Sequence, residues 1–231
     1  MNDQAISFLR RRILVRHHPS AFLLGAQLLS LLLYAVYDGM HSGRALLGAF
    51  SVIVLALAVW VVSRGPAANW IAWMIAIPAF LLSLLSALVV DPHLLVWSSL
   101  LRVALYFYTA GSLIAYMMGD HRVTTDELFA AGATFTLIAW GFAYVYLVCQ
   151  AWDLGSFAGV TRPGEPRTFI ELLFLSFTNL SAVGLGDVLP INSPARVLVM
   201  LEQFAGVAYI AVVVSRLIGL TIVRQDHKDK S

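Results

Sequence analysis

The segment with the clearest capacity for chemistry lies near the end of the chain, where residues 181–190 read Ser-Ala-Val-Gly-Leu-Gly-Asp-Val-Leu-Pro. Two glycines spaced Gly-x-Gly on an extended strand let the backbone carbonyls of several chains approach a common axis. Rings of carbonyl oxygens can replace the water shell of a cation. Because Gly-x-Gly occurs by chance in many chains, its meaning depends on the elements that surround it.

The composition indicates a membrane protein. Hydrophobic residues make up 60% of the chain and charged residues only 12%, which is too few for an ordinary soluble surface. Apolar runs of about 18 or more residues predict membrane-spanning helices. We identify six such runs, at 20–37, 45–63, 69–90, 94–118, 129–152 and 195–222. The fold class that follows is an all-α integral membrane protein with six transmembrane helices.

Basic residues in short loops predict the orientation, because they remain on the cytoplasmic side. With six spans, one side of the membrane carries Arg10, Arg11, Arg12, Arg16, Arg64, Arg122, Arg216, Arg224, Lys228 and Lys230, and the other carries Arg44, Arg162, Arg167 and Arg196. Both termini are therefore predicted in the cytoplasm, in a multi-pass protein of the cell (inner) membrane. The net charge of +2 requires no nucleic-acid partner, and anionic lipid explains the basic N-terminal arm.

The segment between the fifth and sixth runs predicts a short helix that does not cross the membrane. Thr168 and Glu171 have the spacing of a capping box, and the helix they open runs for about a dozen residues to Leu180. A helix this short must enter the membrane and return. Irregular backbone at that depth is tolerated only where it is buried in protein or lines a water-filled cavity. Thr124 and Glu127 predict a second capping box, at the start of the fifth span.

A capped short helix, a Gly-x-Gly segment, an aspartate and a final membrane-length helix together resemble the pore unit of tetrameric potassium channels, whose filter signature is Thr-Val-Gly-Tyr-Gly-Asp. The resemblance covers about 129–222. More narrowly, the chain is similar to short bacterial six-helix potassium channels, whose inner helix carries Leu-Glu and later Tyr-x-Ala-x-x-x-Ser/Ala-Arg. Here these read Leu201-Glu202 and Tyr209 to Arg216. The resemblance implies a homotetramer in the lipid bilayer that conducts potassium ions through a re-entrant pore helix and filter loop, with no other cofactor.

The resemblance also assigns roles by position in this sequence. The backbone carbonyls that would bind potassium belong to Ala182, Val183, Gly184 and Leu185, and Gly186 completes the filter. The side chains that would support the filter are Ser181, Asp187, Thr178 and Glu202. The inner cavity would be lined by Val207, Ile210 and Val214. Gly206 is either a gating hinge or a helix-packing glycine.

Two departures from the family signature bear on selectivity. Leu185 replaces the filter tyrosine, and Ala182 replaces the threonine whose hydroxyl completes the innermost ion site. Two alternatives to a potassium-selective channel therefore stay open: a weakly selective cation channel, and a non-conducting membrane scaffold or regulatory subunit with a degenerate filter. An enzyme is not expected, because the spans contain no paired catalytic carboxylates, nucleophile–base pair or metal-ligand cluster.

Two charged residues inside the predicted spans need partners. Glu202 either faces a hydrated crevice or accepts hydrogen bonds from Ser176, Thr178 or Asn179 on the short helix. The fourth run carries only Arg102, whereas a voltage sensor needs several arginines at three-residue spacing. Arg102 is either a structural charge, snorkelling or bonded to Ser98 or Ser99, or a residual sensor.

The domain organisation follows from these assignments. It consists of a cytoplasmic basic arm at 1–19, a voltage-sensor-like four-helix bundle without the arginine ladder at 20–118, a cytoplasmic linker at 119–128, a pore domain at 129–222 and a cytoplasmic tail at 223–231. A channel with this bundle is predicted to be insensitive to voltage.

Overall fold

A computed structural model of the chain describes residues 18–37, 53–61, 63, 69–88, 92–119, 124–159 and 164–219. Most of the predicted basic arm, the first part of the second predicted span and the predicted tail lie outside these residues. The labelled elements are α2 (Pro19–Tyr37), α4 (Asn69–Leu88), α5 (Pro92–Met117), α6 (Thr125–Trp152), η1 (Leu154–Ser156), β1 (Phe157–Gly159), α7 (Phe169–Leu180), β2 (Val188–Pro190), α8 (Ser193–Tyr209) and η2 (Ile210–Val214). A further helix covers 53–61.

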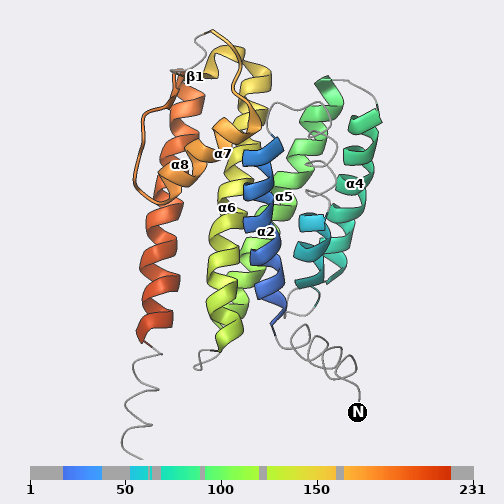
Figure 1. Cartoon of the computed structure of the whole chain (residues 1–231), viewed down its shortest axis with the longest axis vertical. Coiled ribbons are helices and arrows are strands. Elements are labelled where there is room, and N and C mark those ends of the chain that lie inside the picture. Colours follow the sequence, from blue (N-terminus) through green and yellow to red (C-terminus); the bar gives the residue numbers. More distant parts are fainter. Residues whose placement is uncertain are drawn as a thin grey trace, which may run out of the picture.

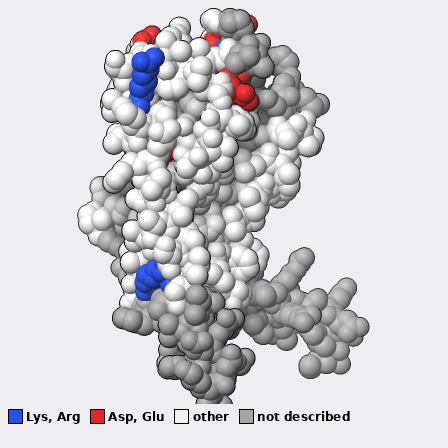
Figure 2. All heavy atoms as spheres, turned by 90° about the vertical axis from the view of Figure 1, so that its left-hand side faces the viewer, with Lys and Arg blue, Asp and Glu red and all other residues white. Residues whose placement is uncertain are grey.

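Within the described residues, four helical stretches are long and apolar enough to cross a membrane. They are Pro19–Val36, His93–Met117, Thr125–Trp152 and Ser193–Gly219, and they coincide with four of the six predicted spans. Seen from the side of α8, charged side chains gather near the two ends of the molecule and the surface between them is largely uncharged (Figure 2). This distribution suits helices that cross a lipid bilayer.

Helix α6 is the centre of the fold. It packs against α2 and α5 on one side and against α7 and α8 on the other, while α4 packs on α5 (Figure 1). Large side chains of α6 such as Trp140 and Tyr146 are fully buried. Trp140 meets Tyr106 of α5 edge to face, with ring centroids 6.0 Å apart, a favourable geometry for aromatic pairs.

Buried polar contacts attach α2 to α6. Asp126, in the first turn of α6, accepts hydrogen bonds from the backbone N–H of Ser20 (3.1 Å) and from its hydroxyl (3.0 Å). Gln27 of α2 accepts a hydrogen bond from Thr136 at 2.7 Å. The carboxylate of Asp126 thereby satisfies one of the free N–H groups at the start of α2, that of Ser20.

The structure adds a small two-stranded sheet that the sequence did not predict. β1 and β2 pair antiparallel, with Phe157 opposite Pro190 and Gly159 opposite Val188. From the end of α7 the chain returns along α8 to this sheet, near the end of the bundle where α6 stops and α8 begins (Figure 1). The sheet therefore anchors the far end of the segment that follows α7.

Candidate functional site: the α7 loop and its supports

The N-terminal end of α7 is fixed by the predicted capping box and by aromatic contacts. The Thr168 side chain accepts from the backbone of Glu171, and the Glu171 carboxylate accepts from the backbone of Thr168 at 2.7 Å. Phe169 packs against Tyr144 of α6, with ring centroids 4.6 Å apart, and against Tyr34 of α2 at 5.9 Å. The predicted helix, its start and its end at Leu180 are confirmed, as is the capping box of Thr124 and Glu127.

The C-terminal end of α7 closes in a Schellman motif. The backbone N–H of Ala182 donates to the carbonyl of Asn179 (3.0 Å), and that of Val183 donates to the carbonyl of Thr178 (2.9 Å). This pattern places Ala182 at the position that glycine usually occupies, and Ala182 has a φ of +60°. The loop begins in a left-handed conformation that is costly for a residue with a Cβ.

The Gly-x-Gly segment is not the regular extended strand that the sequence analysis expected. Gly184 has a φ of +65°, and turns occur at 181–182 and 186–187. The backbone N–H of Gly184 also donates to the Thr178 carbonyl, at 3.0 Å. The Ser181 hydroxyl donates to the Thr178 carbonyl at 3.3 Å, so it faces the short helix.

Every residue of the loop from 181 to 187 is exposed in the single chain. Val183 is 64% exposed and Leu185 51%, although both are apolar. A Cβ added at Gly184 or Gly186 would have no neighbour within 4 Å. An apolar loop with open space around it is suited to contact with other molecules.

The far end of the loop is secured by Asn192, which caps α8. Its side chain accepts from the backbone of Ala195 (2.9 Å) and donates to Asp153 (2.8 Å) and to Ser156 (2.9 Å). The hydrogen bonds that Asp153 accepts from Asn192 and from the backbone of Gly155 hold the pKa of this carboxyl below its ordinary value. One asparagine thus joins the end of α6 to the start of α8.

Glu202 of α8 is completely buried, so it does not face a hydrated crevice. Its two carboxylate oxygens contact the hydroxyls of Tyr146 of α6 and Ser176 of α7. Ser176 was among the predicted partners, and Tyr146 was not. The other two predicted donors, Thr178 and Asn179, instead donate to the Leu175 carbonyl, at 2.9 Å each.

The donors and acceptors around Glu202 indicate whether its carboxyl group is protonated. The Ser176 hydroxyl also lies 2.7 Å from the carbonyl of Ala139, and a serine has a single proton to donate. Both contacts are satisfied together when Glu202 carries a proton and donates it to Ser176, which donates to Ala139. Among the described residues no basic side chain pairs with Glu202, and an unpaired carboxylate inside a span is costly.

Gly206 lies where α8 crosses the end of α7. A Cβ built on it would stand 2.1 Å from the carbonyl oxygen of Leu180, so this glycine permits a close backbone approach. Three residues earlier, Gln203 donates to the Asn179 side chain at 3.0 Å. The packing role of Gly206 therefore has a structural basis, and its hinge role stays a prediction.

A turn of π-helix follows α8, on the C-terminal side of Gly206. It covers Ile210–Val214 and shifts the register of the residues that follow. Val207 and Ile210 are exposed, at 57% and 44%, whereas Val214 is half-buried and packs on the core. The three predicted cavity residues thus do not share one environment in the single chain.

Arg102 is bound to α6 and not to a serine of its own helix. Its guanidinium donates to the hydroxyl of Tyr144 at 2.8 Å and lies 5.2 Å from the centre of that ring. Ser98 and Ser99 donate instead to the Leu95 carbonyl. These contacts favour the structural role of Arg102, because they fix the side chain between α5 and α6.

Part of the chain matches the model of a known protein family. Residues 132–222 match the model of a family described as "Ion channel", a segment that contains most of α6 and all of α7, the loop and α8. The match supports an ion-channel function, and it indicates a channel and not an enzyme. A search of curated proteins and a search of solved structures gave no match.

Proposed function

We propose that four copies of this chain form a potassium-selective channel, with the loop from 181 to 187 as the filter of each copy. The proposal rests on one observation above the others. Within the segment that matches the ion-channel family, an exposed loop with positive φ at Ala182 and Gly184 follows directly on the capped helix α7. The backbone carbonyls of 182–185 are the proposed potassium ligands.

The signs of φ at three consecutive residues support this use of the loop. Residues 182 and 184 have positive φ, and the intervening Val183 does not. A ring of ligands requires successive carbonyls to face the same side of the chain, and backbone torsions of alternating sign are compatible with that requirement. The glycines of the filter can adopt such torsions without a steric penalty.

The exposed apolar surface of α8 and the loop supports assembly. Side chains more than half exposed include Met200, Leu201, Phe204, Val207 and Val212 on the inner helix. Phe204 of α8 is 75% exposed, whereas Glu202 of the same helix is completely buried. A helix with one face on α6 and α7 and another face uncovered suits a central position among four copies.

The membrane placement completes the proposal. Two further spans, over 45–63 and 69–90, bring the total to six, and α7 is re-entrant. The basic residues at both ends of the chain support a position of both termini on the cytoplasmic side of the cell (inner) membrane. The β1–β2 sheet and the filter entrance then face outward.

Weak selectivity is the alternative that a specific observation favours. Ala182 has no hydroxyl to complete an innermost site, and Leu185 is 51% exposed without a hydrogen-bond donor in its side chain. Both departures leave fewer ligands or fewer supports for the filter than the family signature provides.

Flux through the reconstituted protein tests the proposal. We expect tetramers in liposomes to give a reversal potential that follows the potassium gradient. Gly184→Ala should abolish permeation, because a Cβ is strained at a φ of +65°. Gly164→Ala is the matched control: it has a φ of +83°, nothing within 4 Å of an added Cβ, and a position outside the loop.

The outcomes separate the alternatives. Equal sodium and potassium permeability would favour the weakly selective channel. Assembled wild-type tetramers without flux, or equal flux in wild type and Gly184→Ala, would contradict the filter assignment.

A further inference from the structure

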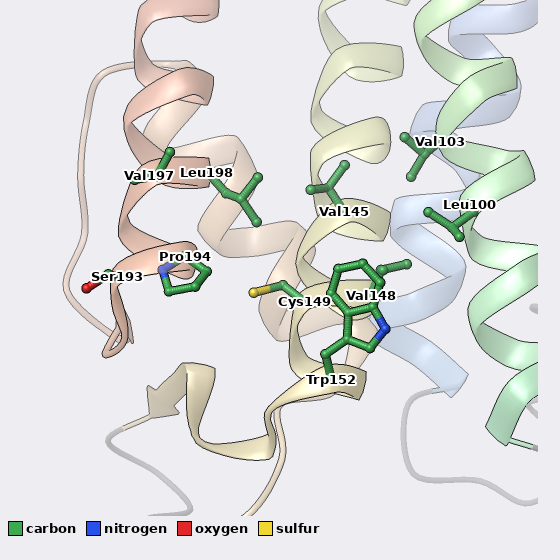
Figure 3. Close-up of a pocket in the computed structure, with 10 residues that line it drawn as sticks. All are labelled: Leu100, Val103, Val145, Val148, Cys149, Trp152, Ser193, Pro194, Val197 and Leu198. Carbon is green, nitrogen blue, oxygen red and sulfur yellow. The ribbon is translucent and has the colours of Figure 1, made fainter.

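A groove opens between α5, α6 and α8, near the end of the molecule that carries β1 and β2. Its volume is about 600 Å³, within the range of about 300–1,000 Å³ typical of ligand sites. The residues that line it are Leu100 and Val103 of α5, Val145, Val148, Cys149 and Trp152 of α6, and Ser193, Pro194, Val197 and Leu198 of α8 (Figure 3).

The lining determines the kind of occupant. Among the residues around the groove only Ser193 has a polar hydroxyl, and no charged side chain lines it. Water in such a space finds too few hydrogen-bond partners to be stable. All three helices are long and apolar enough to cross a membrane. In a membrane the groove therefore opens toward the acyl chains of the surrounding lipid.

The two ends of the groove differ in chemistry. Trp152, 78% exposed, and Ser193 stand at the end where α6 stops and α8 begins, beside the polar residues Asp153 and Asn192. Tryptophan concentrates at the level of lipid headgroups. Toward the middle of the helices the lining changes to Val103, Val145 and Leu198, which are aliphatic (Figure 3).

We propose that this groove binds one acyl chain of a membrane phospholipid, with the headgroup beside Trp152 and Ser193. The lipid contacts α5 of the N-terminal bundle on one wall and α6 and α8 of the matched ion-channel segment on the others. It therefore fills the space between the bundle and the inner helix. The inference requires that the chain spans a membrane, and it does not depend on which ion the protein conducts.

The experiment uses the full chain in phosphatidylcholine nanodiscs that contain a phospholipid with a photoreactive diazirine on its acyl chain. Peptide mapping after illumination should show several-fold more label in 145–152 and 193–198 than around Leu32 and Val36. Those two residues are 65% and 66% exposed on α2 and report ordinary surrounding lipid. Equal labelling of all exposed apolar helix faces would overturn the proposal.

A filling substitution provides the matched comparison. Val197→Trp places an indole in the groove from a position that is 48% exposed, and it should reduce labelling of the groove several-fold. Ile218→Trp, on the same helix at 55% exposure and away from the groove, should leave the labelling unchanged. Equal labelling of the groove in both variants would contradict the assignment.

The single cysteine gives a second measurement on the unmodified chain. Cys149 is the only cysteine in the sequence, and its thiol lies in the wall of the groove (Figure 3). Adding phosphatidylcholine to delipidated protein should slow its reaction with N-ethylmaleimide several-fold. A rate independent of lipid would show that an acyl chain is not the occupant.

Discussion

The carbonyl of Leu180, at the end of α7, lies directly against Gly206 of α8. A Cβ on Gly206 would stand 2.1 Å from the carbonyl oxygen and 2.9 Å from the carbonyl carbon. Because both are backbone atoms, they cannot move aside as the tip of a side chain can. Gly206 therefore sets how closely the inner helix approaches the start of the loop.

Gly206→Ala should lower the stability of the protein. The added methyl must push α7 and α8 apart, and overpacking of this kind costs about 1–3 kcal/mol. A hinge role predicts the opposite sign, because alanine is favoured over glycine inside a helix by about 1 kcal/mol. The apparent melting temperature in detergent distinguishes the two roles.

Gly219→Ala is the control for this substitution. Gly219 lies on the same helical stretch, and a Cβ there meets nothing within 4 Å. We expect its melting temperature to stay level or to rise slightly. A rise for Gly206→Ala that matches the control would show that Gly206 is not a packing residue.

Ala182 should accept glycine and resist threonine. At a φ of +60°, glycine relieves a strain of about 1 kcal/mol, and a β-branched side chain increases that strain. The free energy of unfolding should therefore rise for Ala182→Gly and fall for Ala182→Thr. Chemical denaturation of the two variants beside the wild type measures both signs.

The threonine variant also tests whether the proposed tetrameric pore keeps this conformation. A β-branched threonine is disfavoured in the left-handed region, so a threonine that completes an ion site would favour a different backbone conformation at residue 182. An unchanged ratio of potassium to sodium permeability in Ala182→Thr is the expected result if the Schellman motif persists. A clear increase in that ratio would show that the end of α7 has a different conformation in the proposed tetramer than in the single chain.

Glu202→Gln should preserve the contacts that join α6, α7 and α8. A glutamine amide donates through nitrogen and accepts through oxygen, as a protonated carboxyl does, so it can donate to Ser176 and accept from Tyr146. We expect a melting temperature close to wild type and unchanged gating. A large loss in Glu202→Gln would indicate that the ionised carboxylate is required.

Two further measurements test whether Glu202 carries a proton. Infrared spectroscopy should detect the carbonyl stretch of a protonated carboxyl, and Glu202→Gln should remove it. Tyr146→Phe removes one hydroxyl and leaves a buried carboxyl oxygen without its donor, at a cost of about 1–3 kcal/mol. The absence of the protonated-carboxyl band in the wild type would contradict the hydrogen-bond count.

The parts of the site that the sequence predicted are those governed by local rules. Both capping boxes follow from a spacing of three residues, and the length of α7 follows from the distance between its cap and Ser181. Hydropathy alone located α2, α5, α6 and α8.

The features that the sequence did not predict depend on pairs that are distant in the chain. Tyr146 meets Glu202 across 56 positions, and Arg102 meets Tyr144 across 42. Several tyrosines on α6 could have reached inward, and no periodicity selects one of them. The Schellman end at Ala182 was missed for a different reason: alanine is a poor residue for a left-handed position, so the sequence favoured an extended strand there.

Acidification should weaken the junction between α6 and α8. The folded-state pKa of Asp153 is lowered by its hydrogen bonds to Asn192 and Gly155. Its contribution to stability is therefore present above the ordinary aspartate pKa and is lost as the pH falls through the lowered value. Melting temperatures measured from neutral pH down to this range should decline more steeply in the wild type than in Asp153→Asn. Parallel curves would mean that the Asp153 contacts do not contribute to stability.

Arg102→Gln should lower stability without changing the dependence of current on voltage. The guanidinium is fixed between α5 and α6 by its hydrogen bond to Tyr144, and a hydrogen bond to a charged group contributes about 1.5–3 kcal/mol. One arginine also supplies little gating charge, because each charge that crosses the field yields only about 2.3 kcal/mol per 100 mV. Conductance–voltage relations should be shallow and superimposable for wild type, Arg102→Gln and the charge-preserving control Arg102→Lys. A steep relation that Arg102→Gln flattens and Arg102→Lys retains would show that this arginine senses voltage.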